Sequence, residues 1–217
     1  MKNIGYRKYS YYENAFQRCT ILSAYYGGLL AADGSLEKLP SGSFIMSLKL
    51  NKQDRSLVDG LKHFIKFDGP IKLVPRSRPQ YSDSMRLRVT VSDRTSSHLK
   101  KYYSIVPNKT DILKPPSLFN DNYIKAFIIG YVDGDGSIFK TARGTIVFSM
   151  LGTYPLLKWI KSFIDENFPC EYPSNITKKY KYTGEYRIEG KRAEVIIDAL
   201  NKMKLPKLNR KWSINNG

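Results

Sequence analysis

The spacing of apolar residues between positions 24 and 103 predicts three helices separated by two β-hairpins. The helical segments are 24–33, which is apolar almost throughout, 57–65, in which apolar residues recur every three to four positions, and 94–103. The first hairpin has turn residues at 40–42 before an alternating strand at 44–50, and the second pairs 71–74 with 85–91 across a turn that contains Pro79. The predicted element order of this part of the chain is αββαββα.

The same order recurs in the second part of the chain. The segment FIIGYVDGDGSIF, residues 127–139, overlaps the segment AYYGGLLAADGSL, residues 24–36, at an offset of 102 positions that places Asp135 on Asp33, Gly130 on Gly28 and Ser137 on Ser35. The later segments are a turn at 143–144, a strand at 145–150, a helix at 156–164, strands at 176–182 and 185–188 around a turn at Thr183 and Gly184, and a helix at 191–203. The predicted fold is α+β, with two pseudo-symmetric αββαββα subdomains at 1–113 and 120–217 and a linker at 114–119.

Alternation along the strands predicts which face of each sheet is exposed. In residues 85–91, Leu87 and Val89 lie on one face while Arg86 and Arg88 lie on the other, because side chains alternate across a strand. An antiparallel sheet commonly leaves one face solvated, and a strand ribbon can enter a DNA major groove. For one such arginine pair an ordinary solvated sheet face is the more common explanation, but four basic hairpins favour binding. The basic residues predicted to contact nucleic acid are Lys49, Arg76, Arg78, Arg86, Arg88, Lys140, Arg143, Lys179, Lys181 and Arg187.

Composition supports a polyanionic partner. The 217 residues include 36 lysines and arginines against 19 aspartates and glutamates, which gives a net charge of +17. No apolar stretch approaches the roughly 20 residues of a membrane span, and the N-terminus lacks an apolar signal core. The expectation is therefore a soluble intracellular protein without a membrane partner, in a compartment that the sequence does not identify. Two cysteines without a CxxC spacing support neither a disulfide framework nor a zinc site.

Two acids at helix C-termini are the candidate chemistry. Asp33 and Asp135 each follow a helix whose small residues would let the two backbones approach closely; the predicted interface glycines are Gly27, Gly28 and Gly130. The negative end of each helix dipole and the nearby second carboxylate both disfavour bare anions. A hard divalent cation between the acids would resolve this conflict. An Asp-Gly helix stop is the ordinary alternative for one copy, and its repetition at a fixed offset favours the metal site.

The two quoted segments resemble the paired motifs of single-chain LAGLIDADG homing endonucleases, and the repeat order extends this resemblance over nearly the whole chain. The resemblance implies paired motif helices at the subdomain interface and saddle-shaped antiparallel sheets on DNA. It also implies that Mg²⁺ is held by Asp33 and Asp135 together with the preceding Ala32 and Gly134, and that Ca²⁺ supports binding without cleavage. An earlier motif acid is matched by Asp133 but not in the first copy, which indicates a capping or interface role.

The family also places a basic side chain late in each subdomain, near the scissile phosphates. Lys109 and Lys211 are again 102 positions apart, which makes them the candidate catalytic lysines; ordinary surface lysines are the alternative. Lys52 and Gln53, between a strand and a helix, are weaker candidates for positioning water.

The resulting functional hypothesis is a monomeric, Mg²⁺-dependent endonuclease that cuts double-stranded DNA at a long, largely non-palindromic site. Intron homing by a free-standing, intron-encoded protein is the expected context. Two alternatives use the same fold: a maturase that binds intron RNA, and a DNA-binding regulator that has lost cleavage. Retention of both acids favours the nuclease, because a pure binding protein has no need for paired anions facing a polyanion.

Overall fold

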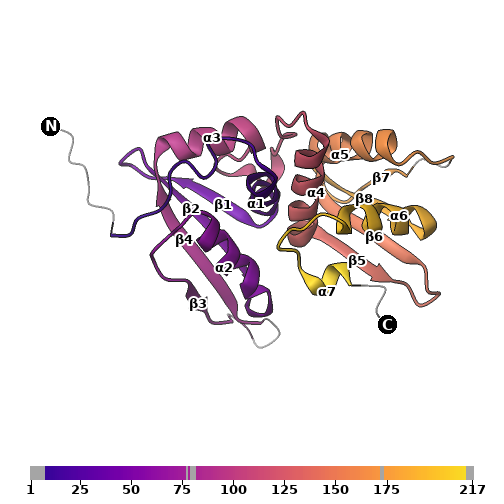
Figure 1. The fold of residues 1–217 in the computed structure, drawn as a ribbon, viewed down its shortest axis with the longest axis horizontal. Helices are drawn as coiled ribbons and strands as arrows, with labels where there is room; N and C mark the ends of the chain where they lie inside the picture. Colours follow the sequence, from indigo (N-terminus) through magenta and orange to yellow (C-terminus); the bar gives the residue numbers. More distant parts are fainter. Residues whose placement is uncertain (1–7, 77, 79–81, 172–173, 214–217) are drawn as a thin grey trace.

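The computed structural model describes residues 8–76, 78, 82–171 and 174–213, and it has two halves with the same order of elements (Figure 1). The first half contains α1 (Ile21–Ala32), β1 (Gly34–Lys38), β2 (Phe44–Asn51), the 3₁₀ helix η1 (Lys52–Asp54), α2 (Arg55–Phe64), β3 (Lys72–Val74), β4 (Ser84–Val91), α3 (Asp93–Tyr103) and the 3₁₀ helix η2 (Lys109–Asp111). The second half contains α4 (Asp121–Asp135), β5 (Gly136–Lys140), β6 (Ile146–Thr153), α5 (Tyr154–Asn167), β7 (Ile176–Lys178), β8 (Thr183–Glu189), α6 (Gly190–Asn201) and α7 (Asn209–Trp212). The predicted αββαββα order is confirmed in both halves, whereas the boundaries at residues 113 and 120 stay a prediction.

Each half is built on one four-stranded antiparallel sheet. The strand orders are β1-β2-β4-β3 and β5-β6-β8-β7, so the two sheets have the same topology. The predicted face of β4 is confirmed: Leu87 and Val89 are buried, whereas Arg88 is exposed on the opposite face. Helix α2 packs against the first sheet, and α5 and α6 pack against the second.

The motif helices α1 and α4 lie side by side at the centre of the molecule, with one sheet on either side (Figure 1). Both helices are mainly apolar around their whole circumference, since every residue from Ser23 to Ala31 is buried. A helix that is apolar on all sides belongs in the interior. The packing of α1 on α4 therefore joins the cores of the two halves.

The second hairpin of the second half differs from its predicted form. Thr183 and Gly184 are the first residues of β8, and the chain turns at Lys179–Tyr182, where the amides of Lys179 and Tyr180 donate to the carbonyl of Thr183. Gly184 allows β7 and β8 to approach each other closely, because a Cβ at this position would lie 2.8 Å from the carbonyl oxygen of Thr177. The predicted turn around Pro79 in the first half lies outside the described residues.

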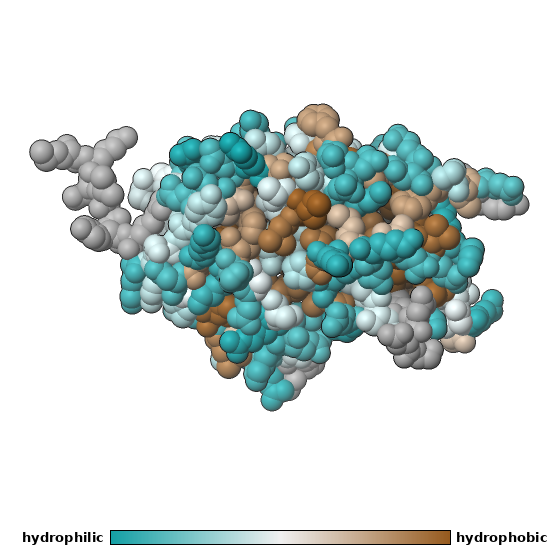
Figure 2. Space-filling view, viewed as in Figure 1, coloured by the Kyte–Doolittle hydropathy of each residue, from teal (hydrophilic) through white to brown (hydrophobic). Residues whose placement is uncertain are grey.

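The face of the molecule seen in Figure 1 is largely hydrophilic, with apolar residues showing between the polar ones over the centre (Figure 2). No helix within the described part of the chain is long and apolar enough to cross a membrane.

Candidate functional site

The site begins at the close contact between the two motif helices. A Cβ added at Gly28 would lie 2.0 Å from the carbonyl oxygen of Phe127, and one added at Gly130 would lie 1.9 Å from that of Tyr25. Each glycine therefore lies against the backbone of the other helix, and the two contacts are related by the pseudo-two-fold. Gly28 and Gly130 therefore lie at the contact between α1 and α4, where the sequence analysis expected them.

The prediction for Gly27 is wrong. A Cβ at this position would meet the ring of Tyr103 on α3 at 2.4 Å, so this glycine faces the first half's own helix. Consecutive residues of a helix point about 100° apart, and only one of two adjacent glycines can face α4. The small residue that does extend the contact is Gly134, whose Cβ would lie 2.4 Å from the Cβ of Ala32.

The close helix contact brings the two candidate acids together. Asp33 is the C-cap of α1 and Asp135 is the last residue of α4, and both are exposed at the surface. Enough protein still surrounds the carboxyls to reduce their hydration. Burial, followed by the charge of Asp135, raises the pKa of Asp33 to about 6, and burial also raises the pKa of Asp135. The acids are therefore held as an electrostatically unfavourable pair, as the sequence predicted.

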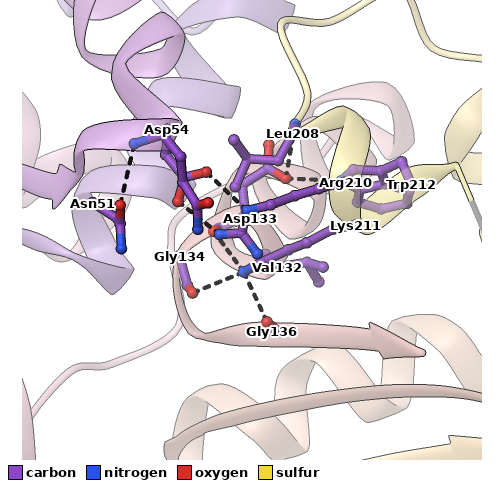
Figure 3. A network of polar contacts seen from close by, with 11 residues as sticks. Asn51, Asp54, Val132, Asp133, Gly134, Gly136, Leu208, Arg210, Lys211 and Trp212 are labelled. Atoms are coloured by element: carbon purple, nitrogen blue, oxygen red, sulfur yellow. Dashed lines mark hydrogen bonds and ion pairs between the residues drawn. The ribbon is translucent and has the colours of Figure 1, made fainter. Parts of the chain in front are cut away.

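Two buried lysines offset the negative ends of these helices. The ammonium group of Lys109, which is only 8% exposed, donates to the carbonyl of Ala32 at 2.9 Å. The ammonium group of Lys211 lies within hydrogen-bond distance of four carbonyls, those of Val132, Asp133, Gly134 and Gly136, at 2.7 to 3.1 Å. Cations at a helix C-terminus are favourable. Thus each motif helix ends against a lysine (Figure 3 shows the second).

The lysines and acids also shift each other's ionisation. Burial lowers the pKa of both lysines, and the charges of Asp135 and Asp33 oppose this effect at Lys109. Both lysines in turn lower the pKa values of the two acids, which burial raises. The four charges therefore form one cluster, and the equal sequence offset of the lysine pair and the acid pair reflects this arrangement.

The donor set at the end of the motif helices suits a hard divalent cation. Two carboxylates and the adjacent carbonyls of Ala32 and Gly134 are oxygen ligands of the kind that Mg²⁺ prefers. Each of these carbonyls accepts one lysine hydrogen bond and retains a second lone pair. Among the residues that the structure describes, no cluster of three or more His, Cys, Asp or Glu side chains could hold a metal ion by itself. Completing a magnesium site here would thus require oxygens from water or a phosphate.

Asp133 has the interface role that its position in the motif indicated. Its carboxylate is 3% exposed and accepts hydrogen bonds from the Tyr25 hydroxyl at 2.7 Å and from the Trp212 indole at 2.8 Å. A third donor is the backbone amide of Leu208 at 3.3 Å. This carboxylate therefore ties α1 and the C-terminal segment to α4, and it is not available as a metal ligand in this arrangement.

The predicted DNA-contacting residues divide into two groups. In the first half, Lys49, Arg86 and Arg88 lie on the outward face of the sheet, and Arg76 and Arg78 are exposed in the β3–β4 connection. In the second half, Arg187 is the outward-facing member of the set, while the remaining four lie at or beside hairpin tips: Lys140, Arg143, Lys179 and Lys181.

The outward face of β8 is not basic, which corrects the expectation of four basic hairpins. Arg187 lies between Glu185 and Glu189 on this face and pairs with Glu189 at 2.5 Å, while its guanidinium lies 5.7 Å from the centre of the Phe139 ring. The alternation of Glu185, Arg187 and Glu189 is visible in the sequence TGEYRIEG and could have predicted this result.

Sequence reasoning missed an ion pair that joins the halves beside the site. The carboxylate of Asp54 at the start of α2 accepts two hydrogen bonds from the guanidinium of Arg210 on α7, at 2.8 and 2.6 Å (Figure 3). The two residues are 156 positions apart, and no local pattern pairs them. Lys52 and Gln53 lie in the adjacent η1, between β2 and α2 as expected, and their proposed role with water stays a prediction.

A small cavity of about 140 Å³ lies beside the acid and lysine cluster. It is lined by residues of both halves, including Ala32, Lys109, Asp135, Thr153 and Tyr180. The cavity thus connects the cluster to the β7–β8 hairpin, where the predicted contact Lys179 also lies.

Comparison with known proteins identifies the fold. Neither protein-family models nor curated proteins give a match to this sequence. Among solved structures, the I-LtrWI LAGLIDADG homing endonuclease bound to target DNA has a TM-score of 0.57 at 15% identity, over 88% of this chain and 87% of that one. The LAGLIDADG meganucleases I-AabMI and I-CpaMI, both bound to uncleaved DNA, have TM-scores of 0.55 and 0.54 at 13% and 12% identity, over 88% and 89% of this chain and 87% and 85% of theirs. The chain therefore has the two-subdomain fold of the LAGLIDADG homing endonucleases that its motifs resemble.

Proposed function

We propose that this chain, which has the LAGLIDADG endonuclease fold, is a site-specific nuclease that hydrolyses both strands of double-stranded DNA with Mg²⁺. The observation that carries the proposal is the cluster of Asp33, Asp135, Lys109 and Lys211 at the paired helix ends. A protein that only binds a polyanion gains nothing from two carboxylates held at raised pKa. The net charge of +17 and the exposed arginines of the first sheet supply the electrostatic attraction to DNA.

In this mechanism Asp33 and Asp135, with the carbonyls of Ala32 and Gly134, would hold the divalent cation. Such an ion supplies an activated water and stabilises the leaving oxygen of a phosphodiester. Lys109 donates one hydrogen bond to Ala32, and its other ammonium hydrogens are available to the developing charge on a phosphate. Lys211, surrounded by four carbonyls, acts first as the cap that fixes the end of α4 and hence the position of Asp135.

One chain is expected per duplex, because the pseudo-two-fold that a symmetric dimer would supply lies within this chain. The two sheets differ in their outward residues, so the two half-sites should differ and the target should be largely non-palindromic. Intron homing is the biological setting that we propose for such an enzyme.

The test replaces each acid by its isosteric amide. Asp33→Asn and Asp135→Asn should each abolish Mg²⁺-dependent cleavage of a target selected from a randomised duplex library, because an amide is a poor ligand for a hard cation. DNA binding measured in Ca²⁺ should be unchanged or tighter, since an anion beside the phosphates has been removed. The stability of both variants should equal or exceed that of the parent, because burial raises the pKa of each acid.

Asp59→Asn is the matched control, since Asp59 is a carboxylate on α2, away from the motif-helix ends, that forms a solvent-exposed pair with Arg55 at 3.1 Å. This variant should cut at the parent rate. Cleavage of both strands at the parent rate by either amide variant at Asp33 or Asp135 would refute the assignment. Cleavage by no form of the protein, with DNA binding retained, would instead favour the inactive regulator.

A further inference from the structure

The residues that cap the corresponding helices α2 and α5 have side chains that make no hydrogen bond to those helices. Asp54 is the N-cap of α2 and Thr153 is the N-cap of α5. Aspartate and threonine are favoured at this position because their side-chain oxygens accept hydrogen bonds from the first helical amides. Neither side chain makes that hydrogen bond here. Both instead contact the other half of the molecule.

The contact made by Asp54 holds the segment that carries Lys211. Its carboxylate is 7% exposed and binds the Arg210 guanidinium through two hydrogen bonds, at 2.8 and 2.6 Å. Arg210 immediately precedes Lys211, and the following residue, Trp212, is bound to Asp133 of α4. The four-residue α7 is therefore fixed on one side by the first half and on the other by α4.

The contact made by Thr153 holds the segment that carries Lys109. The Thr153 hydroxyl, on a residue that is 2% exposed, donates to the carbonyl of Leu113 at 2.5 Å. Leu113 lies two residues beyond η2, the 3₁₀ turn that contains Lys109. The N-cap of α5 thus crosses the interface through a single neutral hydrogen bond, whereas the N-cap of α2 does so through a charged pair with two hydrogen bonds.

We propose that Asp54 and Thr153 are positioning residues that place the candidate lysine of the opposite half. Each lysine segment is held across the interface, so neither lysine is correctly placed unless the two halves are docked. The two clamps act separately: loss of the Asp54–Arg210 pair loosens the segment that carries Lys211, and loss of the Thr153 hydrogen bond loosens the segment that carries Lys109. This inference rests on the proposed function only for its effect on cleavage.

Accessibility of the two lysines tests the positioning without any need for nuclease activity. The folded protein is acylated at pH 8 with a water-soluble amine-reactive ester, and the rate at each lysine is measured by mass spectrometry. In the parent, Lys109 and Lys211 should react at least tenfold more slowly than the exposed Lys140, because both ammonium groups are buried and hydrogen-bonded.

Asp54→Asn should raise the acylation rate of Lys211 about threefold or more and leave Lys109 unchanged, whereas Thr153→Val should do the reverse. Arg210→Lys, which keeps the charge but loses the two-bond fork, should give an intermediate rise at Lys211. Asp59→Asn, which removes a solvent-exposed ion pair of α2, should change neither rate. An equal rise at both lysines in the Asp54 variant, or no rise at Lys211, would overturn the proposal.

Cleavage gives a second readout of the same variants. Under the proposed function each lysine acts at one of the two scissile phosphates, so Asp54→Asn should slow one strand about tenfold and accumulate nicked circles from a supercoiled plasmid. Equal slowing of both strands would contradict a separate clamp for each lysine. If the parent cuts no DNA, the proposed function fails, and the acylation rates alone decide whether the clamps exist.

Discussion

The two halves of the molecule have the same order of helices and strands, but they differ in the contacts that fix each motif helix and in the residues on the outward face of each sheet. In both, a motif helix ends at an aspartate beside a buried lysine, and the two helices meet through reciprocal glycine contacts. Lys109, however, contacts one carbonyl and lies in a 3₁₀ turn, whereas Lys211 contacts four carbonyls and lies in a helical turn that Trp212 ties to Asp133. The end of α4 is therefore more firmly fixed than the end of α1.

The sheets differ more strongly than the motif helices. The outward strand positions of the first half carry Lys49, Lys72, Arg86 and Arg88 against Glu37. Those of the second half carry Arg187 between Glu185 and Glu189, beside the apolar Phe139 and Leu151. The two halves thus have equivalent residues at the contact between the motif helices and different residues on the sheet faces that would contact a ligand. Close packing requires the motif helices to stay similar, whereas the exposed sheet faces can differ and so recognise different half-sites.

We expect the largest effect from substitutions at the glycine contacts between α1 and α4. Gly28→Ala and Gly130→Ala should each lower the free energy of unfolding by about 3 kcal/mol, the upper range for overpacking, because the new methyl group would meet backbone atoms at 2.0 and 1.9 Å. For a chain of this size that loss corresponds to a fall in Tm of roughly 10 °C. Chemical denaturation and calorimetry measure both quantities.

Gly60→Ala on α2 is the comparison for this pair, because its methyl group would meet a side-chain atom, the Tyr26 hydroxyl at 2.5 Å, instead of the backbone of another helix. Alanine also favours the helix, so the loss of stability should be smaller than that of either motif-helix variant. If Gly28→Ala is tolerated and Gly130→Ala is not, the two sides of the helix contact are not equivalent, and the symmetric part of the comparison is wrong.

The second prediction tests whether the outward faces of the two sheets differ in their affinity for DNA. Replacing Arg86 and Arg88 together by glutamine should weaken DNA binding roughly tenfold or more, since a base contact of this kind is worth about 1–3 kcal/mol. If both contact phosphate instead, the slope of log affinity against log salt should fall by about two. Arg187→Gln should change affinity less than twofold, because Glu189 pairs with this guanidinium at 2.5 Å, more closely than Glu37 pairs with Arg88 at 3.5 Å, and Arg86 adds a second positive charge to the first face.

The matched measurement is a titration of all variants on one duplex over a salt series. Glu189→Gln should tighten binding by releasing Arg187 from its partner. Equal losses from the two halves would show that the outward face of β8 contacts DNA as closely as that of β4, and would remove the proposed asymmetry.

The sequence predicted the parts of the site that repeat. Asp33 and Asp135, and Lys109 and Lys211, could be found because the same residue types recur at one offset, and the glycine contacts because small residues on adjacent helices permit close approach. Strand faces were predictable from alternation, as Arg88 and Val89 show. These features depend on neighbouring or regularly spaced residues, and they can therefore be predicted from the sequence pattern.

What the sequence did not predict depends on contacts between distant residues. The Asp54–Arg210 pair joins positions 156 apart, and nothing beside either residue indicates the other. The sequence alone does not distinguish the roles of Gly27 and Gly28. The contact with the Tyr103 ring shows that Gly27 packs against α3. Likewise, Gly184 has the composition of a turn but the location of a strand, because its lack of a side chain admits the Thr177 carbonyl.

The smallest expected effect concerns the outer helices, which only the second half ties together by an ion pair. Asp165 on α5 accepts hydrogen bonds from Lys161 and from Arg192 on α6, the latter at 2.5 Å, and Arg192 also donates to Ser174 at 3.1 Å. Within the described residues, no ion pair of this kind links α2 to α3 in the first half. Burial tends to raise the pKa of Asp165, but the hydrogen bonds from Lys161 and Arg192 outweigh it and hold this pKa below its usual value.

Because the folded pKa of Asp165 is depressed, its contribution to stability is present above the unfolded value of about 3.9 and is lost as pH falls through the folded value. Asp165→Asn should therefore cost less than about 1 kcal/mol at pH 7, since the carboxylate is 33% exposed and screened by solvent. Urea denaturation from pH 7 to pH 3.5 should show this difference shrinking as the parent carboxylate becomes protonated. The control Asp198→Asn, at an exposed carboxylate on α6, measures the effect of removing a surface carboxylate from the same pair of helices. A difference that stays constant with pH would mean that Asp165 acts through packing and not through its charge, and the polar tie between α5 and α6 would then not distinguish the two halves.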